Sequence, residues 1–461
     1  MKKLLFCLLL ILSLTFVSCK KKDPVPTPAP KPDVKVEVDY STIQDAYYTD
    51  EFIISTIKLN VTKGTETSQV PVLPTMVKNL MDTYPEGKYT FNVTCEGVDV
   101  SFDVNFVNRP VYTEGLSFTF ENGSYTVMKY NGTESIVTIP SEFNHYSVTK
   151  IGSNAFSNNQ IIEEIVIPST VKEIGNSAFN QCENLRRVHM SNNIETIGKA
   201  AFYQAVNLKS IYLPATIKSL KDKSLDSIQI VYLESSNTLE KLNDKNLNEK
   251  AYIYKDIKAD EIYEAEEFVY IKNEDENGVT LTEYLGSDSC VEVTSLIDEH
   301  YNVTKLGAHI FSGMKNITEI YLPYTLKTIL PYACQGMGIS KVTFPAALTE
   351  IMTYAFSTCE NLTTIKFAEG LKKIGDSAFA SNFANETVIL PNGLEYVGSF
   401  AFQNNYNNTS IFIPASVTFI GSGAFYSNNG AVIKTPLSKV PSTWDPNWNP
   451  SGNKVQFETY E

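Results

Sequence analysis

An Ala-Phe pair that returns at a fixed spacing constrains the fold of this chain more than any other sequence feature. Neighbouring pairs within each run, such as Ala155-Phe156 and Ala178-Phe179, are 23 residues apart. The pairs are Ala155-Phe156, Ala178-Phe179, Ala201-Phe202, Ala355-Phe356, Ala378-Phe379, Ala401-Phe402 and Ala424-Phe425. A fixed period of this size predicts a solenoid, in which each coil packs mainly on its two neighbours.

Each repeat also has its own local pattern. Alternating apolar residues precede a proline, as in Ile165-Val166-Ile167-Pro168, and proline ends a strand because it has no N–H to donate. The following Val-x-x-Ile-Gly places a glycine, Gly175 in one copy, where we expect a tight corner. Asparagines five residues after the Phe are expected to hydrogen-bond the turn backbone rather than a ligand. These are Asn184, Asn207, Asn316 and Asn361.

The combined pattern Ile-Pro-x-x-Val-x-x-Ile-Gly-x-x-Ala-Phe-x-x-Cys-x-x-Leu resembles the bacterial surface-antigen type of leucine-rich repeat, called BspA-like. The resemblance covers roughly residues 113 to 440. It implies a leucine-rich-repeat solenoid on a secreted or surface protein of gut or oral bacteria, with adhesion as one known role. It implies no enzyme activity.

The first residues predict export. Met1-Lys2-Lys3, a short apolar run and Ser18-Cys19 make a signal peptide over residues 1–18, because the run is shorter than the roughly 20 residues that span a bilayer. Phe16-Val17-Ser18-Cys19 resembles a lipobox, so we expect Cys19 to be lipidated and the chain to be anchored to the outer membrane, exposed at the cell surface. The alternative is a plainly secreted protein. Residues 19–33 alternate proline and predict a semi-rigid tether.

Residues 34–112 show strand-like alternation without the repeat. The stretches 52–61 and 89–94 predict strands, and Glu96-Gly97 predicts a hairpin turn into the stretch 98–104. The fold class that follows is mainly β, with an immunoglobulin-like β-sandwich before the solenoid.

The solenoid is expected in two halves, residues 113–265 and 266–440. The stretches 144–152 and 299–307 match each other, and each half begins with a hairpin predicted around Asn122-Gly123 or Asn277-Gly278. The first hairpin is expected to cap the coil and the second to mark a junction. Residues 441–461 break the repeat and contain Trp444 and Trp448. They predict a C-terminal cap, with a sugar-binding platform as the alternative.

Charge and residue content exclude several function classes. The formal net charge of −14 disfavours nucleic acid and anionic surfaces as partners. The four histidines show no metal-ligand spacing with cysteine or carboxylate. Cys182, Cys334 and Cys359 occupy core positions of the repeat and predict buried thiols rather than disulfides. We therefore expect no enzyme and no cofactor or metal.

The remaining candidate site is the outward face of the strands that precede the prolines. Residues on either side of the inward apolar residue should project from this face. The candidate binding residues are His189, Tyr212, Tyr321, Lys366, Ile389 and Phe412. They predict a non-enzymatic adhesion protein that binds a protein or cell-surface partner. The alternatives are a carbohydrate-binding lipoprotein of a glycan-uptake system and a purely structural cell-envelope protein. Exposed aromatic and β-branched residues also suit strands without any ligand.

Overall fold

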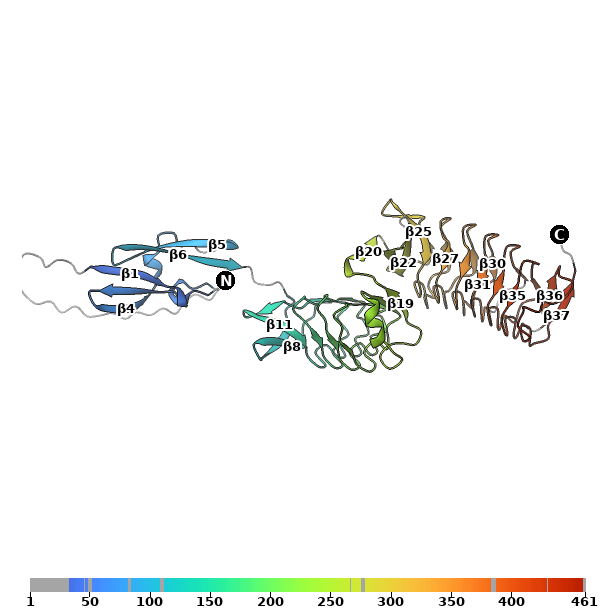
Figure 1. Ribbon diagram of the computed structural model, residues 1–461, viewed down its shortest axis with the longest axis horizontal. Coiled ribbons are helices and arrows are strands. Elements are labelled where there is room, and N and C mark those ends of the chain that lie inside the picture. Colours follow the sequence, from blue (N-terminus) through green and yellow to red (C-terminus); the bar gives the residue numbers. More distant parts are fainter. Residues whose placement is uncertain are drawn as a thin grey trace, which may run out of the picture. The chain divides into compact units, whose positions relative to one another are not determined.

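The computed structural model describes residues 33–44, 46–48, 52–81, 84–107, 112–265, 267–274, 278–382, 387–428 and 430–458. The chain divides into two compact units, Met1–Arg109 and Pro110–Glu461 (Figure 1). The predicted signal peptide, the tether before Asp33 and the predicted lipidation site Cys19 lie outside the described residues.

Two three-stranded sheets form the first unit, with strand orders β1-β3-β4 and β2-β6-β5. The strands are β1 (Val34–Asp39), β2 (Tyr47–Tyr48), β3 (Lys58–Lys63), β4 (Glu66–Pro71), β5 (Gly87–Cys95) and β6 (Val98–Val107). Short 3-10 helices are η1 (Tyr40–Thr42), η2 (Ile54–Thr56) and η3 (Pro74–Met76). Residues of both sheets, among them Leu59 and Phe91, share one buried core. The immunoglobulin-like assignment is not confirmed, because the described strands number six where the constant-type fold has about seven.

The hairpin predicted at Glu96-Gly97 is confirmed. Both residues have positive φ, 50° and 81°, as a tight two-residue turn between paired strands requires. The strand predicted over 52–61 is wrong in its first half, where η2 replaces it. Ile54 and Ile57 are both buried, and this three-residue spacing suits a 3-10 turn. Alternation with period two begins only at Ile57.

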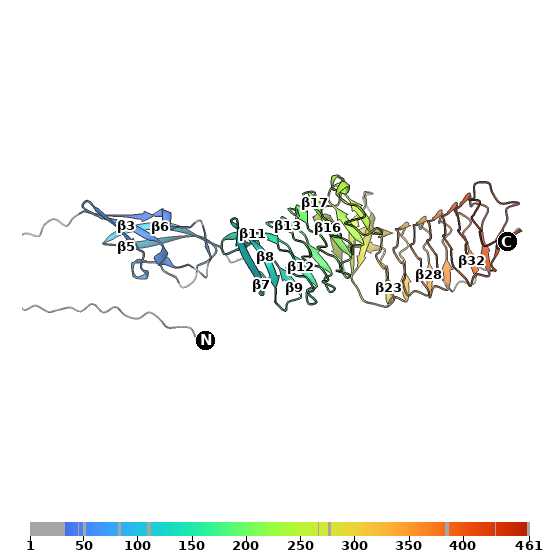
Figure 2. The same cartoon turned by 90° about the horizontal axis from the view of Figure 1, so that it is seen from below.

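The second unit is a β-solenoid of about 14 turns with roughly 23-residue spacing, as the sequence predicts. Each regular coil contributes one short strand before the glycine and one before the proline. We call these the glycine-side and proline-side strands. Figure 2 shows β23, β28 and β32 following one another along one edge of the second half.

The two kinds of strand form separate sheets in each half. The regular coils pair in parallel, and antiparallel pairs of described strands occur only at the start of each half. In the first half, the glycine-side strands and the hairpin before them are β7 (Leu116–Glu121), β8 (Ser124–Tyr130), β11 (Tyr146–Ile151), β13 (Glu173–Ile174), β15 (Thr196–Ile197) and β17 (Ser219–Leu220), with β10 (Glu142–Phe143) on β11. The proline-side strands are β9 (Ile136–Thr138), β12 (Glu164–Val166), β14 (Arg187–His189), β16 (Ser210–Leu213), β18 (Ile230–Leu233) and β19 (Tyr252–Lys255). Two 3-10 helices follow β18 and β19, η4 (Ser236–Lys241) and η5 (Ala259–Glu261).

The second half repeats this arrangement. Its glycine-side sheet contains β20 (Ile262–Ala265), β21 (Phe268–Lys272), β22 (Gly278–Tyr284), β25 (Tyr301–Leu306), β27 (Thr328–Ile329), β29 (Glu350–Ile351), β31 (Lys373–Ile374), β33 (Tyr396–Val397) and β35 (Phe419–Ile420), with β24 (Leu296–Ile297) on β25. Its proline-side strands are β23 (Cys290–Glu292), β26 (Glu319–Tyr321), β28 (Lys341–Thr343), β30 (Thr364–Lys366), β32 (Thr387–Ile389), β34 (Ser410–Phe412), β36 (Val432–Thr435) and β37 (Lys454–Phe457).

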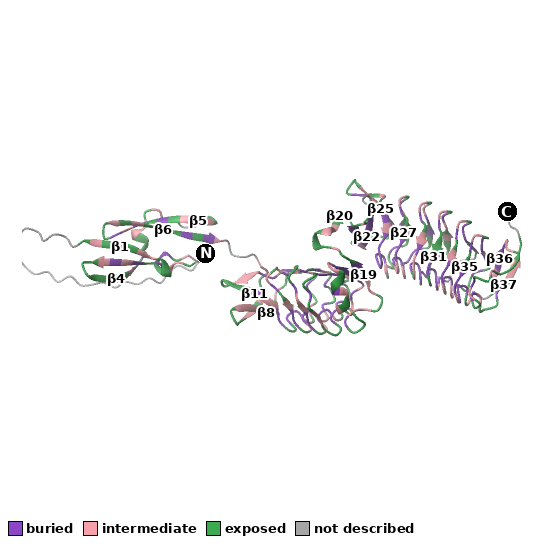
Figure 3. Cartoon of the chain, viewed as in Figure 1, coloured by how far each residue is buried: buried purple, intermediate pink, exposed green. Residues whose placement is uncertain are grey.

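Stacked phenylalanines fill the coils. Phe179 lies 4.9 Å from Phe156 and 5.2 Å from Phe202, with the rings nearly parallel. A second stack runs from Phe356 to Phe425 in the other half. Burying one such side chain contributes on the order of 1.5–3 kcal/mol. Figure 3 shows buried residues recurring from coil to coil along the second unit.

The repeat glycines are required for a reason other than the predicted one. Gly175 and Gly398 do not have positive φ, whereas Ser177 does, at 53°. A Cβ at Gly175 would lie 2.6 Å from the backbone nitrogen of Ser153 in the previous coil. The predicted turn is present, since the Ala178 N–H donates to the Gly175 carbonyl at 3.4 Å, but it does not need the left-handed φ that glycine allows. Glycine is needed because a Cβ would collide with the backbone of the previous coil.

The asparagine prediction is confirmed. Asn184 Nδ2 donates to the carbonyl of Gln160 at 2.6 Å, and Asn207 Nδ2 donates to Glu183 at 2.8 Å. Asn316 and Asn361 make the corresponding bonds to Ser287 and Gly338. Each asparagine thus satisfies a backbone acceptor one coil earlier.

The second half begins by packing on the first. Hairpin β21–β22 starts its glycine-side sheet, and Ile271 of β21 joins the hydrophobic cluster of the first half that contains Tyr232 and Tyr254. The Tyr254 hydroxyl accepts a hydrogen bond from the backbone N–H of Ala308 at 3.0 Å. The hairpin predicted at Asn122-Gly123 is confirmed by positive φ at both residues. The turn predicted at Asn277-Gly278 falls partly outside the described residues.

Candidate functional site

The second-half candidates lie in register on the outward side of the proline-side strands. Ile389 pairs with Phe412 across β32 and β34, and Lys366 pairs with Thr343 across β30 and β28. Tyr321 and Ile389 are 57% and 62% exposed, which is unusual for large apolar side chains. Lys366 is exposed and Phe412 is half-buried. Four of the six candidates therefore lie on one face.

The first-half candidates have different surroundings. His189 is exposed, and its Nε2 lies 2.8 Å from Glu164 Oε1. Tyr212 also projects from its strand but is only 6% exposed, because η5 and β20 lie beside it. Burial raises the pKa of Tyr212. Tyr212 therefore does not belong to an exposed binding face, contrary to the sequence-based expectation that placed it there.

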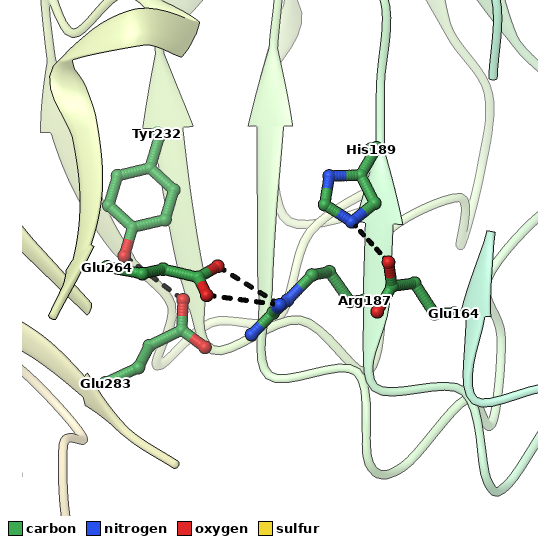
Figure 4. Close-up of polar contacts among 6 residues, drawn as sticks. All are labelled: Glu164, Arg187, His189, Tyr232, Glu264 and Glu283. Carbon is green, nitrogen blue, oxygen red and sulfur yellow. Dashed lines mark hydrogen bonds and ion pairs between the residues drawn. The ribbon is translucent and has the colours of Figure 1, made fainter. Parts of the chain in front are cut away.

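A crevice of about 660 Å³ lies between the proline-side strands of the first half and β20 and β22 of the second. Arg187 on β14 forms an ion pair with Glu264 on β20 at 3.1 Å. The Tyr232 hydroxyl on β18 donates to Thr282 Oγ1 at 2.6 Å and lies 3.2 Å from Glu283 Oε1. Figure 4 shows Arg187 meeting Glu264 and Tyr232 meeting Glu283. These contacts join strands of the two halves.

The electrostatics of the crevice reflect burial. Burial raises the pKa of Glu283, while hydrogen bonds with Ser210 and Tyr232 and the charge of Arg187 lower it. Burial likewise raises the pKa of Tyr232 far above its ordinary value. The Arg187–Glu264 pair is one-third to one-half exposed and is worth at most about 1 kcal/mol. The arrangement suits a structural junction between the halves.

A second hollow, of about 470 Å³, lies beside Tyr321. It is lined by residues of β26 and β28, among them Glu319 and Lys341. These two strands belong to separate sheets, so the ladder of hydrogen bonds is interrupted at this point. The hollow adds a concave feature to the exposed face that carries Tyr321.

Metal-ligating side chains and thiols are the other groups of chemical interest. Among the described residues, no group of three or more His, Cys, Asp or Glu side chains could hold a metal ion. Cys182, Cys334 and Cys359 are buried and free, as the sequence predicts. Burial raises the pKa of the Cys182 and Cys359 thiols to about 12. Cys290 is exposed on β23, and the sequence analysis assigned it no role.

Both tryptophans are buried rather than displayed. Trp444 and Trp448 are 4% and 7% exposed, and Trp448 packs edge-to-face on Phe425 at 6.0 Å. Trp444 Nε1 donates to the carbonyl of Val417 at 3.2 Å. Neither ring offers a flat exposed platform on which a sugar could stack.

A family model described as "BspA type Leucine rich repeat region" matches residues 129–254, 288–385 and 327–440. These matches together cover more than half of the chain. The chain belongs to this family. No curated protein matches the sequence. Within the described residues, no helix is both long enough and apolar enough to cross a membrane.

Solved structures to which this chain is similar come from several bacteria. A leucine-rich repeat protein of T. pallidum is 26% identical, with 43% of this chain and all of that chain covered, at a TM-score of 0.36. A leucine rich cell surface protein of Faecalibacterium prausnitzii is 19% identical, with 77% and 100% covered, at 0.32. The pneumococcal vaccine antigen PcpA is 16% identical, with 76% and 99% covered, at 0.35.

The sequence analysis predicted a junction at the second hairpin, but it missed the side chains that form this junction and a second asparagine ladder. Asn382, Asn405 and Asn428 are fully or almost fully buried. Asn405 Nδ2 donates to the carbonyls of Phe379 and Phe402 at 3.0 and 2.8 Å, and its Oδ1 accepts from the Asn382 N–H at 2.9 Å. These asparagines are 23 residues apart, and they occupy the repeat position that Cys359 holds one coil earlier. This spacing could have predicted the ladder.

Proposed function

We propose that this chain is a non-enzymatic surface protein whose second solenoid half binds a protein partner through its proline-side face. The observation that carries the proposal is the row of exposed side chains on adjacent strands, including Tyr321, Lys366 and Ile389. Large exposed apolar groups in a polar setting are typical of interaction sites. Stacked strands hold them rigidly, so little conformational entropy is lost on binding.

The experiment is binding of the chain from Asp33 to Glu461 to arrays of extracellular proteins and of polysaccharides. Binding to a protein should weaken at least about 10-fold when Tyr321 and Ile389 are replaced by alanine, since hot-spot residues contribute about 2 kcal/mol each. Tyr324→Ala is the matched control, because Tyr324 is 72% exposed but lies outside the proline-side strands. Unchanged affinity in the double variant would refute the assignment of this face.

The same experiment separates the alternatives. Saturable glycan binding without protein binding would favour the carbohydrate-binding role, and no binding to either array would favour a structural role in the envelope. The burial of Trp444 and Trp448 removes one argument for glycan binding. Protein binding therefore remains the leading proposal.

We also propose that Cys19 is lipidated and anchors the protein to the outer membrane, exposed at the cell surface. The support is the lipobox-like Phe16-Val17-Ser18-Cys19 together with the family of the chain, one relative of which is described as a cell surface protein. Wild-type protein should incorporate a labelled fatty acid and partition into detergent. Cys19→Ala should do neither, and equal labelling of both would contradict lipidation.

A further inference from the structure

Four lysines point outward from the last proline-side strands of the second half. They are Lys341 on β28, Lys366 on β30, Lys434 on β36 and Lys454 on β37. Lys341, Lys366 and Lys454 are exposed and Lys434 is half-buried. The outward positions of these strands, and of β32 and β34 between them, hold no Asp or Glu. The face is therefore basic in a chain whose formal net charge is −14.

Two lysines of the glycine-side sheets form ion pairs with a neighbouring coil. Lys373 pairs with Glu350 one coil away at 2.9 Å, and Lys150 pairs with Glu173 at 2.7 Å. On the proline side, Lys434 pairs with Glu458 at 3.2 Å. Lys341, Lys366 and Lys454 form no ion pair with any residue that the structure describes. The proline-side face thus carries positive charge that the chain itself does not neutralise.

Apolar side chains lie between the two groups of lysines. Ile389 on β32 is 62% exposed, and Phe412 on β34 lies next to it in register. The order across the face is basic, apolar, basic. The six strands from β28 to β37 form two sheets, β28-β30 and β32-β34-β36-β37. Paired strands are about 4.8 Å apart, so the six strands span at least roughly 24 Å, the length of about seven residues of extended chain.

We infer that this face binds an extended protein segment of about seven residues with an apolar middle and acidic residues at both ends. The inference rests on the proposed function and names the class of partner for the same face. The middle of the segment covers Ile389 and Phe412, and its carboxylates pair with the lysines on either side. Because carboxylates pair with lysines at both ends, these pairs also fix the position of the segment along the face.

The test measures binding of fluorescein-labelled peptides to the chain from Asp33 to Glu461 by fluorescence polarisation. The peptides share a Leu-Phe-Leu centre and end in Glu-Asp, Ser-Ser or Lys-Lys on both sides. The acidic-ended peptide should bind on the order of 10-fold more tightly than the Ser-ended one at low salt, since several exposed ion pairs contribute about 0.2–1 kcal/mol each. This advantage should shrink when salt shortens the screening length.

Charge reversal supplies the decisive variant. Lys366→Glu combined with Lys454→Glu should abolish the preference for acidic ends, because one lysine and one glutamate then remain at each end of the face. Both side chains are exposed, so folding should be unaffected. Lys315→Glu combined with Lys327→Glu is the matched control, because it changes the net charge equally on exposed residues outside this face. The control should keep the preference for acidic ends.

Three results would overturn the inference. They are equal binding of all peptides, no binding of any peptide, and lysine-dependent binding to phosphatidylglycerol vesicles without discrimination among the peptides. Suppose instead that a protein partner binds through Tyr321 and Ile389 with an affinity that neither salt nor the lysine substitutions change. That result would refute this inference and leave the proposed function intact. If neither a protein nor a peptide required this face for binding, both the inference and the proposed function would be refuted.

Discussion

The Tyr232 hydroxyl donates a 2.6 Å hydrogen bond to the Thr282 hydroxyl, and this buried contact joins the two halves of the solenoid. Tyr232 projects outward from β18, at the position that His189 holds on β14 and Tyr212 on β16. It is 2% exposed because the first hairpin of the second half covers it. The outward face of the first half is thus used for packing within the chain near its end.

Replacing Tyr232 by phenylalanine should weaken this junction. The ring would remain, but Thr282 and Glu283 would lose their shared donor, at a cost of about 1–2 kcal/mol. Urea unfolding followed by circular dichroism would measure the loss. Tyr146→Phe is the matched control, since Tyr146 is 50% exposed, and it should change the unfolding midpoint little. Equal midpoints for wild type and Tyr232→Phe would show that the hydroxyl contributes nothing.

Glu283→Gln should make the protein more stable at alkaline pH. Burial raises the pKa of Glu283 above its ordinary value of 4.5, so the folded state holds the proton more tightly than the unfolded state. That contribution is fully present below pH 4.5 and is lost as pH rises through the raised pKa. Glutamine does not titrate, so the variant should melt at a higher temperature than wild type at pH 8 and at a similar temperature near pH 4.

Glu264→Gln serves as the comparison for that experiment. It removes the partially exposed ion pair with Arg187, so a loss of at most about 1 kcal/mol is expected. If Glu283→Gln instead lowered the melting temperature at pH 8, the charged form of Glu283 would be favoured by its surroundings. The assignment of burial as the dominant influence on its pKa would then be wrong.

Much of the fold was predictable because every repeat must meet the same physical requirements at the same positions. The inward Phe, the proline and the turn asparagine each recur with 23-residue spacing, so one correct interpretation applies to every coil. A junction was predicted at the second hairpin, but the packing of that hairpin on the first half was not, although its signal was present. In the first hairpin, Ser117 and Thr119 alternate with apolar residues, whereas Val269 and Ile271 replace them in the second. A strand that is apolar on both faces is buried on both faces.

The burial of Tyr212 could not be read from its own repeat. Its local pattern, Ile211-Tyr212-Leu213-Pro214, is like Ile320-Tyr321-Leu322-Pro323, yet Tyr212 is 6% exposed and Tyr321 is 57% exposed. The difference comes from residues far along the chain, in η5 and β20, that lie over β16. Local periodicity tells which way a side chain points from its coil but not what covers it.

Substitution of a repeat glycine should test how closely the coils approach. In Gly398→Ala, the new Cβ would lie 2.5 Å from the backbone nitrogen of Asp376. The coils would have to separate, and we expect a loss of about 2–4 kcal/mol, comparable to overpacking a core. Gly313→Ala is the informative comparison, since Gly313 has φ of 74° and open space around it. Gly313→Ala should lower the stability only by the roughly 1–2 kcal/mol that a non-glycine residue costs in the left-handed conformation.

Removal of one buried asparagine should interrupt the second ladder. Asn405→Ala leaves the Asn382 N–H without its acceptor, and an unsatisfied buried group costs about 1–3 kcal/mol. The carbonyls of Phe379 and Phe402 each lose one donor but keep another, from Asn382 and Asn428. A loss of about 1–3 kcal/mol in unfolding free energy is expected. Asn392→Ala, at an exposed turn position, should be nearly neutral. A similar small effect for both would show that water satisfies the vacated groups.

Thiol reactivity should distinguish the cysteines by burial. Cys182, Cys334 and Cys359 lie inside the coils, and burial holds their thiol pKa values high, at about 12 for Cys182 and Cys359. Only the thiolate attacks a disulfide reagent, so these residues should stay unreactive at pH 8 in the native chain from Asp33 to Glu461. Cys290 is exposed and should react rapidly with dithionitrobenzoate.

One fast thiol per chain is therefore expected from native protein and all five after unfolding. Cys290→Ser should abolish the fast phase while leaving the slow one unchanged. Cys95 is buried in the first unit, and burial raises its pKa, so its reaction should follow local opening of that unit. If Cys334 reacted as fast as Cys290, the coil that it fills would have to open readily, because its side chain has no exposed surface in the closed coil.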